Sequence, residues 1–342
     1  METVRLKSHV IRRAEKSDVS KIIKYLEKEW SPNHIFVKSP EFFEYEHCRG
    51  DKVNGILAEN LETGEIDGIL LMYPVADDVE GIDFFGGIWS VSHSCKTPML
   101  GYKLIENVLK VTGAKSHSGV GINPNTTARI FRGINGQRVG KLFHYYMLND
   151  CTEYKVACVE NRRIKQEKNG VARFITLSSI SELNSLFPLK KYKEMPFYKD
   201  ENYVERRYFK HPIYDYKVVA VSIDDAVEAI VIYRVIECNG AKIARIIDFL
   251  GEEQALSECG VAFQNLMNEE MLEYIDFYQY GLSDNVLKDA GFSLKDENDS
   301  NIIPNYFEPY LQNNIDIWFH TPYEKCWIFK GDGDQDRPSR VN

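Results

Sequence analysis

A strand, a loop, a helix and a second strand follow one another over residues 82–122, and this order constrains the fold more than any other feature. Apolar residues dominate 82–91, which predicts a buried strand. They recur at helical spacing over 98–110, and a short apolar strand follows at 118–122. Two strands joined in this way through a helix form a right-handed parallel crossover. The sequence therefore predicts a fold of the α/β class.

The same order of elements occurs twice along the 342 residues, a length that exceeds one small core. We predict two tandem domains, residues 1–150 and 151–342, each a mixed twisted β-sheet flanked by helices. A polar stretch at 165–170 is expected to belong to the linker. In the first half, strands are expected at 9–12, 55–59, 66–73, 82–91, 118–122 and 142–148, with helices after Asp18, within 30–48, over 98–110 and around 128–131. In the second half, strands are expected at 216–221, 227–237, 242–250, 274–280, 315–320 and 326–330, with helices at 181–187, 260–272 and 284–290.

The composition argues against several classes of protein. A formal net charge of -9 disfavours nucleic-acid binding, which needs a basic face. The sequence shows no run of eighteen apolar residues and no signal peptide, so we expect neither a membrane span nor secretion. Seven scattered cysteines without a C-x-x-C pair favour reduced thiols in the cytoplasm. The Asp-rich string at 332–336 lacks the closing glutamate of a calcium loop, so no metal site is predicted.

The loop between the strand and the helix of the crossover has the features of an anion site. Thr97 is expected to cap the helix and Pro98 to occupy its first position, where a missing N–H costs nothing. The backbone N–H groups of 99–101 would then point out of the helix at the positive end of its dipole. Gly101 allows close approach of a phosphate, and Lys96 adds positive charge.

Residues 89–109, WSVSHSCKTPMLGYKLIENVL, resemble motif A of the GNAT superfamily of N-acyltransferases. In that motif a strand runs into a loop that cradles the pyrophosphate of coenzyme A. Lys96 matches the basic position of the loop and Gly101 its last small position, while Thr97 and Met99 replace two earlier glycines. The resemblance implies a GNAT-like fold for each domain and acyl-CoA as the co-substrate.

Residues 123–133, NPNTTARIFRG, resemble motif B of the same superfamily. Asn125 and Ala128 match, and Phe131 stands where the family often has a tyrosine that protonates the departing CoA thiolate. A thiolate can leave near neutral pH without this proton, because thiol pKa values lie near about 8.5. Together the two motifs assign CoA binding to Lys96, Thr97, Met99, Leu100, Gly101, Tyr102, Asn125 and Arg129.

Further stretches at 30–47, 206–221, 305–310 and 331–338 resemble two-domain GNAT proteins of bacterial O-antigen and capsule pathways, which contribute to lipopolysaccharide biosynthesis. This resemblance implies transfer of an acyl group from CoA to the amine of a dTDP-linked amino-dideoxy sugar. Acetyl and 3-hydroxybutanoyl both remain open as the acyl group. The expected partners are therefore a CoA thioester and a nucleotide-linked amino sugar. The expected sugar-nucleotide contacts are Asn33, His34, Trp89, Arg207, Tyr208, His211, Glu308 and Arg337.

An amine must lose its proton to attack a thioester, so a general base is expected. His93 lies between the central strand and the CoA loop, His34 lies in the segment where GNAT folds bind the acceptor, and Asp83 lies on the central strand. Solvent is the alternative proton acceptor, in which case catalysis rests on positioning and on backbone N–H groups. In the second half, Glu252 and Glu253 follow the matching strand and would repel a pyrophosphate, so CoA is expected in the first half only.

Two rival functions remain open. Transferases that take their acyl group from aminoacyl-tRNA also use tandem GNAT-type domains, but the acidic net charge disfavours an RNA substrate. A non-catalytic module that binds a sugar nucleotide or an acyl-CoA would account for the missing loop glycines and the missing motif B tyrosine. Release of the CoA thiol from candidate substrates distinguishes an enzyme from such a module.

Overall fold

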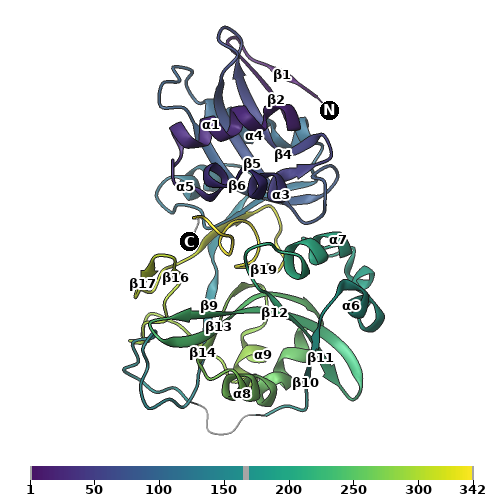
Figure 1. The fold of residues 1–342 in the computed structure, drawn as a ribbon, viewed down its shortest axis with the longest axis vertical. Helices are drawn as coiled ribbons and strands as arrows, with labels where there is room; N and C mark the ends of the chain where they lie inside the picture. Colours follow the sequence, from purple (N-terminus) through teal and green to yellow (C-terminus); the bar gives the residue numbers. More distant parts are fainter. Residues whose placement is uncertain (1, 165–168, 341–342) are drawn as a thin grey trace. The chain divides into compact units, whose positions relative to one another are not determined.

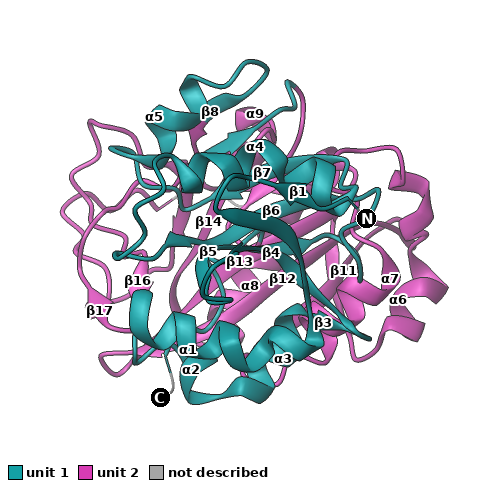
Figure 2. Cartoon of the chain, turned by 90° about the horizontal axis from the view of Figure 1, so that it is seen from above, with its two compact units in different colours: residues 1–139, 319–324, 332–342 teal, residues 140–318, 325–331 magenta. Residues whose placement is uncertain are grey.

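The chain forms two units, and the computed structural model describes residues 2–164 and 169–340 (Figure 1). Unit 1 comprises residues 1–139, 319–324 and 332–342, and unit 2 comprises 140–318 and 325–331 (Figure 2). Of the linker predicted at 165–170, residues 165–168 lie outside the described residues. No helix in the described part of the chain is long and apolar enough to cross a membrane.

The first sheet contains the predicted crossover. Its strands are β1 (Val4–Arg5), β2 (His9–Glu15), β3 (Cys48–Arg49), β4 (Lys52–Asn60), β5 (Ile66–Pro74), β6 (Asp83–Val91), β7 (Ser116–Val120), β8 (Arg138–Lys141) and β18 (Trp318–Thr321). The strand order is β1-β2-β4-β5-β6-β7-β18-β8, with β3 paired to β4. β6 and β7 are parallel and are connected through α4 (Leu100–Thr112), which confirms the predicted crossover.

Helices cover both faces of the first sheet. The apolar sides of α1 (Val19–Glu29), α2 (Ile35–Lys38) and α3 (Pro40–His47) pack with Leu57 and Ile69. The apolar sides of α4 and α5 (Thr127–Arg132) pack with Ile56 and Leu70. Successive residues of a strand point to opposite faces, so these neighbouring side chains belong to two separate cores.

The second sheet lies in unit 2 and repeats the plan. Its strands are β9 (Phe143–Leu148), β10 (Arg173–Leu177), β11 (Lys217–Ile223), β12 (Ala226–Cys238), β13 (Ala241–Gly251), β14 (Leu272–Tyr280), β15 (Ser293–Leu294) and β19 (Ile328–Phe329). They run in the order β10-β11-β12-β13-β14-β9-β15, with β19 paired to β14. The parallel strands β13 and β14 are connected through α8 (Gly260–Glu269), as α4 connects β6 and β7. Further α-helices of unit 2 are α6 (Ile180–Leu186), α7 (Glu201–Val204) and α9 (Asp284–Asp289), and β16 (Tyr306–Phe307) pairs with β17 (Tyr310–Leu311).

Two predicted strands have exchanged halves: each pairs in the sheet of the half in which it was not expected. The strand predicted at 142–148 was expected to close the first half, but as β9 it pairs with β14 in the second sheet. The strand predicted at 315–320 was expected in the second half, but β18 pairs with β7 in the first sheet. For this reason the units divide the chain differently from the predicted boundary at residue 150. A local apolar pattern predicts a strand but does not identify its partner.

The helix expected after Asp18 is confirmed, and one predicted helix cap is different. Asp18 is the N-cap residue of α1, but its carboxylate accepts hydrogen bonds at 2.7 and 2.8 Å from the Arg12 guanidinium and makes no cap hydrogen bond. α4 begins at Leu100, and its N-cap is Met99 in the left-handed conformation (φ 61°), not Thr97. Residue type favours Thr at a cap, but the path of the loop moves the start of α4.

Candidate active site

The central strand of the first sheet extends beyond its parallel neighbour. β6 pairs with β7 as far as Gly86↔Gly119 and then runs on to Val91, while β7 pairs on its other side with β18. A register shift against β5 marks the start of this extension, and such bulges are common next to functional sites. We call residues 87–91 the open edge of β6, because their backbone extends past the last pair with β7.

The open edge leads into the first turn of α4. The Lys103 N–H donates to the Met99 carbonyl at 3.0 Å, so the N–H groups of residues 100–102 precede the first bond within the helix. Such first-turn N–H groups have no partner inside a helix and lie at the positive end of its dipole. Lys96 is exposed shortly before this turn. The structure thus places a helix terminus of the kind that can bind an anion where the sequence predicts one, shifted by one residue.

Gly101 holds this first turn against the end of β6. A β-carbon on Gly101 would lie 3.3 Å from the Val91 side chain and 3.4 Å from the Trp89 ring, and Trp89 Nε1 donates to the Gly101 carbonyl at 3.1 Å. Trp89, a predicted sugar contact, therefore packs against the first turn of α4. The Thr97 hydroxyl lies 3.1 Å from that of Ser8 and ties the loop to the start of β2.

His93 follows the open edge and is held by Glu29 of α1. Its Nδ1 and its backbone N–H both lie 2.9 Å from Glu29 Oε2, and the Ser92 hydroxyl donates to Oε1 at 3.0 Å. Burial would raise the pKa of Glu29, but these hydrogen bonds and one from Lys28 lower it to about 2. An ionised carboxylate only accepts hydrogen bonds, so the His93 ring carries a proton on Nδ1.

Two buried histidines that the sequence analysis missed lie at the last β6–β7 pair. His117 stacks on Phe84 with ring centroids 4.7 Å apart, and His320 lies 4.9 Å from His117 at an interplanar angle of 86°. A β-carbon on Gly86 would lie 2.9 Å from His117 Nε2, and one on Gly119 would lie 2.7 Å from His320 Nε2. The two glycines therefore let both rings approach the strand backbone where the open edge begins.

Burial keeps both imidazoles neutral. It lowers the pKa of His117 to about 3, and burial together with His117 lowers the pKa of His320 well below its ordinary value. His320 Nδ1 lies 3.0 Å from Gln137 Oε1, while Gln137 Nε2 donates to the His117 carbonyl at 3.4 Å. With the amide in this orientation, His320 donates from Nδ1 and retains an acceptor at Nε2. Phe131, at the motif B tyrosine position, stacks on His320 with a centroid separation of 3.4 Å.

The acid-rich C-terminal string, residues 332–337, contacts β6 and β7 at the end where their pairing stops. Gly333 has a left-handed φ of 71°, and a β-carbon there would lie 3.5 Å from Phe85 and 3.8 Å from Val120. A β-carbon on Gly121 would lie 2.0 Å from the Gln335 side chain. The string thus packs on both β6 and β7 beside their last pair.

Arg337 fixes this string to α3. Its guanidinium pairs with the buried carboxylate of Glu46, its Nε donates to the Gly333 carbonyl at 2.7 Å, and its charge lies 4.2 Å from the centroid of the Tyr73 ring. A β-carbon on Gly87 would lie 2.7 Å from the same Tyr73 ring. Arg337, predicted to contact a sugar-nucleotide phosphate, is therefore part of a buried ion pair next to the open edge.

The other residues predicted in unit 1 are spread over it. His34 accepts a backbone N–H of α2 at Nδ1 (3.3 Å), and burial lowers its pKa to about 4. Asn33 beside it is exposed. Asp83 begins β6 at the end opposite α4 and accepts hydrogen bonds from two hydroxyl groups at 2.6 and 2.7 Å. Asn125 and Arg129 are exposed around the start of α5.

The four predicted residues of unit 2 gather around one aromatic hollow. Tyr208 and His211 line this hollow, which has a volume of about 490 Å³. Glu308 Oε2 accepts a hydrogen bond from the hydroxyl of Tyr214, another lining residue, at 3.4 Å. Arg207 is buried and lies 4.7 Å from the centroid of a further lining tyrosine. The size and the aromatic lining suit a small organic ligand.

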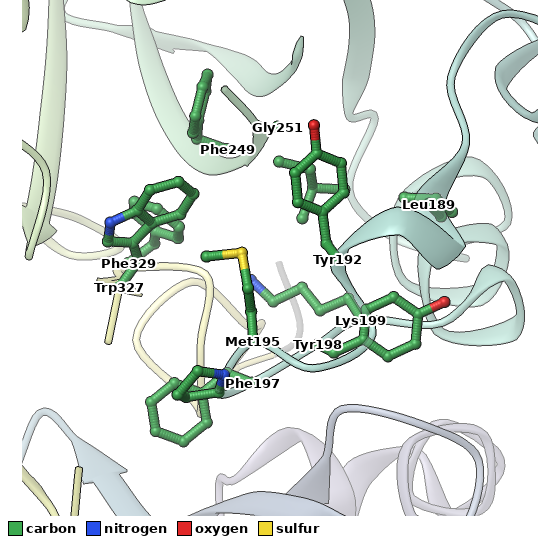
Figure 3. A pocket seen from close by; sticks show the side chains of 12 residues that line it. Leu189, Tyr192, Met195, Phe197, Tyr198, Lys199, Phe249, Gly251, Trp327 and Phe329 are labelled. Atoms are coloured by element: carbon green, nitrogen blue, oxygen red, sulfur yellow. The ribbon is translucent and has the colours of Figure 1, made fainter. Parts of the chain in front are cut away.

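A second cavity in unit 2 has a volume of about 50 Å³ (Figure 3). Tyr192, Met195, Phe249, Trp327 and Phe329 are among the side chains that line it. Pockets for drug-sized ligands measure about 300–1,000 Å³, so this cavity admits a small group and not a nucleotide.

The loop of unit 2 that corresponds to the anion-binding loop carries negative charge. Glu252 follows β13 and accepts hydrogen bonds from Lys191 Nζ at 2.6 Å and from the Tyr192 hydroxyl at 2.9 Å, which lower its pKa. Glu253 accepts the Ser283 N–H at 3.1 Å. Side chains donate to Glu252 and a backbone N–H donates to Glu253, and an approaching pyrophosphate would meet two anions.

The sequence matches no protein-family model and no curated protein. Among solved structures, a GCN5-related N-acetyltransferase from Anabaena variabilis superposes with a TM-score of 0.53 at 11% sequence identity. The superposition covers 91% of this chain and 71% of the chain from Anabaena variabilis. A probable N-acyltransferase from Enterococcus faecalis superposes with a TM-score of 0.55, covering 84% of this chain and 70% of its own at 9% identity. The two sheets, each with a helix-connected parallel pair, therefore have the fold of the GCN5-related N-acetyltransferases.

Proposed function

We propose that this chain is an acyl-CoA-dependent N-acyltransferase whose CoA site lies in unit 1. The observation that carries this proposal is the open edge of β6 together with the first-turn N–H groups of α4, which follows it after one loop. The exposed backbone of a strand can pair with the amides of an extended ligand arm, and the helix terminus can bind its diphosphate. The N-acyltransferase neighbours in structure support the same reading.

The length of the open edge fits the arm of CoA. The arm from phosphorus to sulfur is about 13 bonds long, equal to about four extended residues or about 15 Å. The strand rises about 16 Å over the five steps from Gly86 to Val91. A diphosphate on the first turn of α4 therefore places the thioester beside Gly86 and Gly87.

Because the CoA arm would span the open edge of β6, we propose different roles for the histidines at its two ends. His117 and His320 lie at the thioester end, and His93 lies at the phosphate end. We assign His320 Nε2, a neutral acceptor, to hold the N–H of the incoming amine, with His117 supporting the ring. For His93 we propose contact with the phosphate end of CoA in place of the base role expected from the sequence.

The reaction is nucleophilic substitution at the thioester carbonyl. The amine nitrogen forms a C–N bond, the carbonyl oxygen becomes an oxyanion, and collapse of this intermediate breaks the C–S bond. The amine gives up one proton and the CoA thiolate takes up one, so the products are an amide and free CoA. Fixed N–H donors and close positioning supply the rate enhancement.

For the acceptor we propose a nucleotide-linked amino sugar, with a dTDP-linked amino-dideoxy sugar receiving an acetyl or 3-hydroxybutanoyl group. The hollow of unit 2 supports this choice, because aromatic side chains such as Tyr208 and Tyr214 bind planar bases and sugar faces. The same hollow also fits one of the rival functions, a non-catalytic module that binds a sugar nucleotide.

A thiol-release assay tests the proposal. The purified chain is incubated with acetyl-CoA or 3-hydroxybutanoyl-CoA and a panel of dTDP-linked amino sugars, and free CoA is measured. We expect release that requires both substrates and an amide product detected by mass spectrometry. Thermal stabilisation by both ligands without any release would overturn the enzyme proposal in favour of the binding module.

A further inference from the structure

Three side chains of unit 1 from distant parts of the sequence place metal-binding atoms together. These are His9 at the start of β2, Asp67 in β5 and Cys95 in the loop before α4, and one atom from each lies within 4.8 Å of the other two. We propose that they bind a divalent transition-metal ion of the zinc type. None of the three is among the residues proposed to bind CoA, although Lys96 and Thr97 line the same hollow.

The three ligand types match the chemistry of zinc. Zinc takes histidine nitrogen, carboxylate oxygen and thiolate sulfur at about 2.0–2.3 Å, and open sites have three protein ligands and one exchangeable position. His9 Nε2 and Asp67 Oδ2 are joined by a hydrogen bond of 2.8 Å. An ion between them replaces the bridging proton and requires them to separate by less than about 1 Å, as bonds of this length in a tetrahedron demand.

Hydrogen bonds already orient two of the ligands. His9 Nδ1 lies 2.9 Å from the Ser8 hydroxyl, and Asn60 Nδ2 donates to Asp67 Oδ2 at 2.9 Å. Metal-binding histidines and carboxylates usually have such partners, which fix the ring tautomer and the direction of the lone pairs. With the His9 proton on Nδ1 and donated to Ser8, Nε2 presents its lone pair to the ion.

The site is buried at its base and open above. His9 is 1% exposed, yet all three ligands line a hollow of about 1050 Å³. The same hollow is lined by Lys7, Lys21, Lys24, Lys28 and Lys96 and by Glu29, Glu62 and Glu65. Positive side chains exceed the negative ones, so we expect an anionic oxygen or hydroxide to occupy the fourth position on the ion.

Binding has a simple proton balance. The ion displaces the thiol proton of Cys95 to solvent, and the His9 proton moves from Nε2 to Nδ1 without leaving the ring. One proton is therefore released per ion bound, and affinity falls at low pH as protons compete for the ligands. The ion would join the start of β2 to the loop that precedes the anion-binding turn of α4.

Cobalt(II) titration of the EDTA-treated full chain tests the site, because a thiolate bound to cobalt gives a near-ultraviolet charge-transfer band. We expect this band to saturate at one ion per chain and to disappear when zinc is added. Cys95→Ser should abolish the band, and Asp67→Asn should lower the affinity at least about 10-fold. Asn60→Ala, which removes a supporting hydrogen bond, should lower it about 10–100-fold.

Cys48→Ser is the matched control, because Cys48 is also a half-buried thiol of unit 1 and lies outside the cluster. This variant should keep the band, and circular dichroism should show that every variant keeps its native fold. The proposal is overturned if the wild-type chain gives no thiolate band. It is overturned equally if Cys95→Ser binds cobalt with the same band and affinity as the wild type. Neither result depends on acyltransfer, so the CoA proposal can fail independently.

Discussion

Burial decides what each histidine of unit 1 can do. It lowers the pKa of His34 to about 4 and that of His117 to about 3, so these rings act as neutral donors or acceptors at pH 7. The side chain of His93, in contrast, is 86% exposed and is held by a buried carboxylate. A neutral buried ring suits the orientation of an uncharged amine, and an exposed ring suits contact with phosphate.

The same substitution at two histidines separates these roles. Asparagine keeps a polar atom near the position of Nδ1 and removes Nε2. We expect His320→Asn to lower kcat by about 100-fold, the scale for loss of one positioned hydrogen bond, with KM for acyl-CoA changed less than about 3-fold. His93→Asn should instead raise KM for acyl-CoA and leave kcat within about 3-fold. Steady-state kinetics that show the reverse pattern would return the base role to His93.

Sequence reasoning found residues by motif and missed those defined by contacts. Glu29 carried a usable signal, because it follows Ile22 and Leu26 on the apolar side of α1, where a carboxylate needs a partner. His117 and His320 carried none, since the strands that bring them together are far apart in the sequence. Lys96 and Gly101 were predicted because the loop motif is local, and their contact with CoA stays a prediction.

At the scale of elements, α4 is held where a diphosphate can reach its terminus. Its predicted start at Pro98 was two residues early, because the left-handed Met99 delays the helix to Leu100. Residue preferences identified the helix and the loop, and the backbone path of the loop set the boundary.

Gly101→Val tests this placement. A branched side chain cannot fit where a β-carbon already lies 3.3 Å from Val91, so the first turn should move away from β6. We expect KM for acyl-CoA to rise about 10-fold and stability to fall by about 1–3 kcal/mol. Leu109→Ala on an exposed part of the same helix should change neither. Unchanged CoA binding in Gly101→Val would show that the first turn does not hold the cofactor.

The C-terminal string depends on one buried ion pair. The side chains of Arg337 and Glu46 are 6% and 2% exposed, so loss of Arg337 removes an ion-pair partner of a buried carboxylate. We expect Arg337→Gln to lower the free energy of unfolding by about 3–5 kcal/mol in urea titrations. The double variant Glu46→Gln with Arg337→Met should recover more than half of this loss. A single variant that costs less than about 1 kcal/mol would contradict the assignment.

At the scale of the whole molecule, most long elements could be predicted and their exchange between halves could not. The crossover of unit 1 and that around α8 both follow from local apolar periodicity. The exchange of β9 and β18 rests on pairing between strands far apart in the chain, for which a single sequence contains no local signal. The same pairing brings His320 to the site.

The buried histidines make stability depend on pH. Their pKa values are lowered on folding, so the unfolded chain binds more protons, and stability is present above about pH 6.5 and is lost as the pH falls. His117, with a folded pKa of about 3, should alone remove on the order of 3 kcal/mol by pH 4. Urea unfolding from pH 7 to pH 4 should show a shallower loss for His117→Asn than for the wild type. Equal slopes would mean that folding does not lower the pKa of His117.

A crystal structure of the chain soaked with coenzyme A tests the central claim most directly. We predict diphosphate oxygens within hydrogen-bond distance of the N–H groups of residues 100–102, with the pantetheine arm along the open edge of β6 and the sulfur beside Gly86. A diphosphate bound elsewhere, with the first turn of α4 contacting only protein or solvent, would contradict the account.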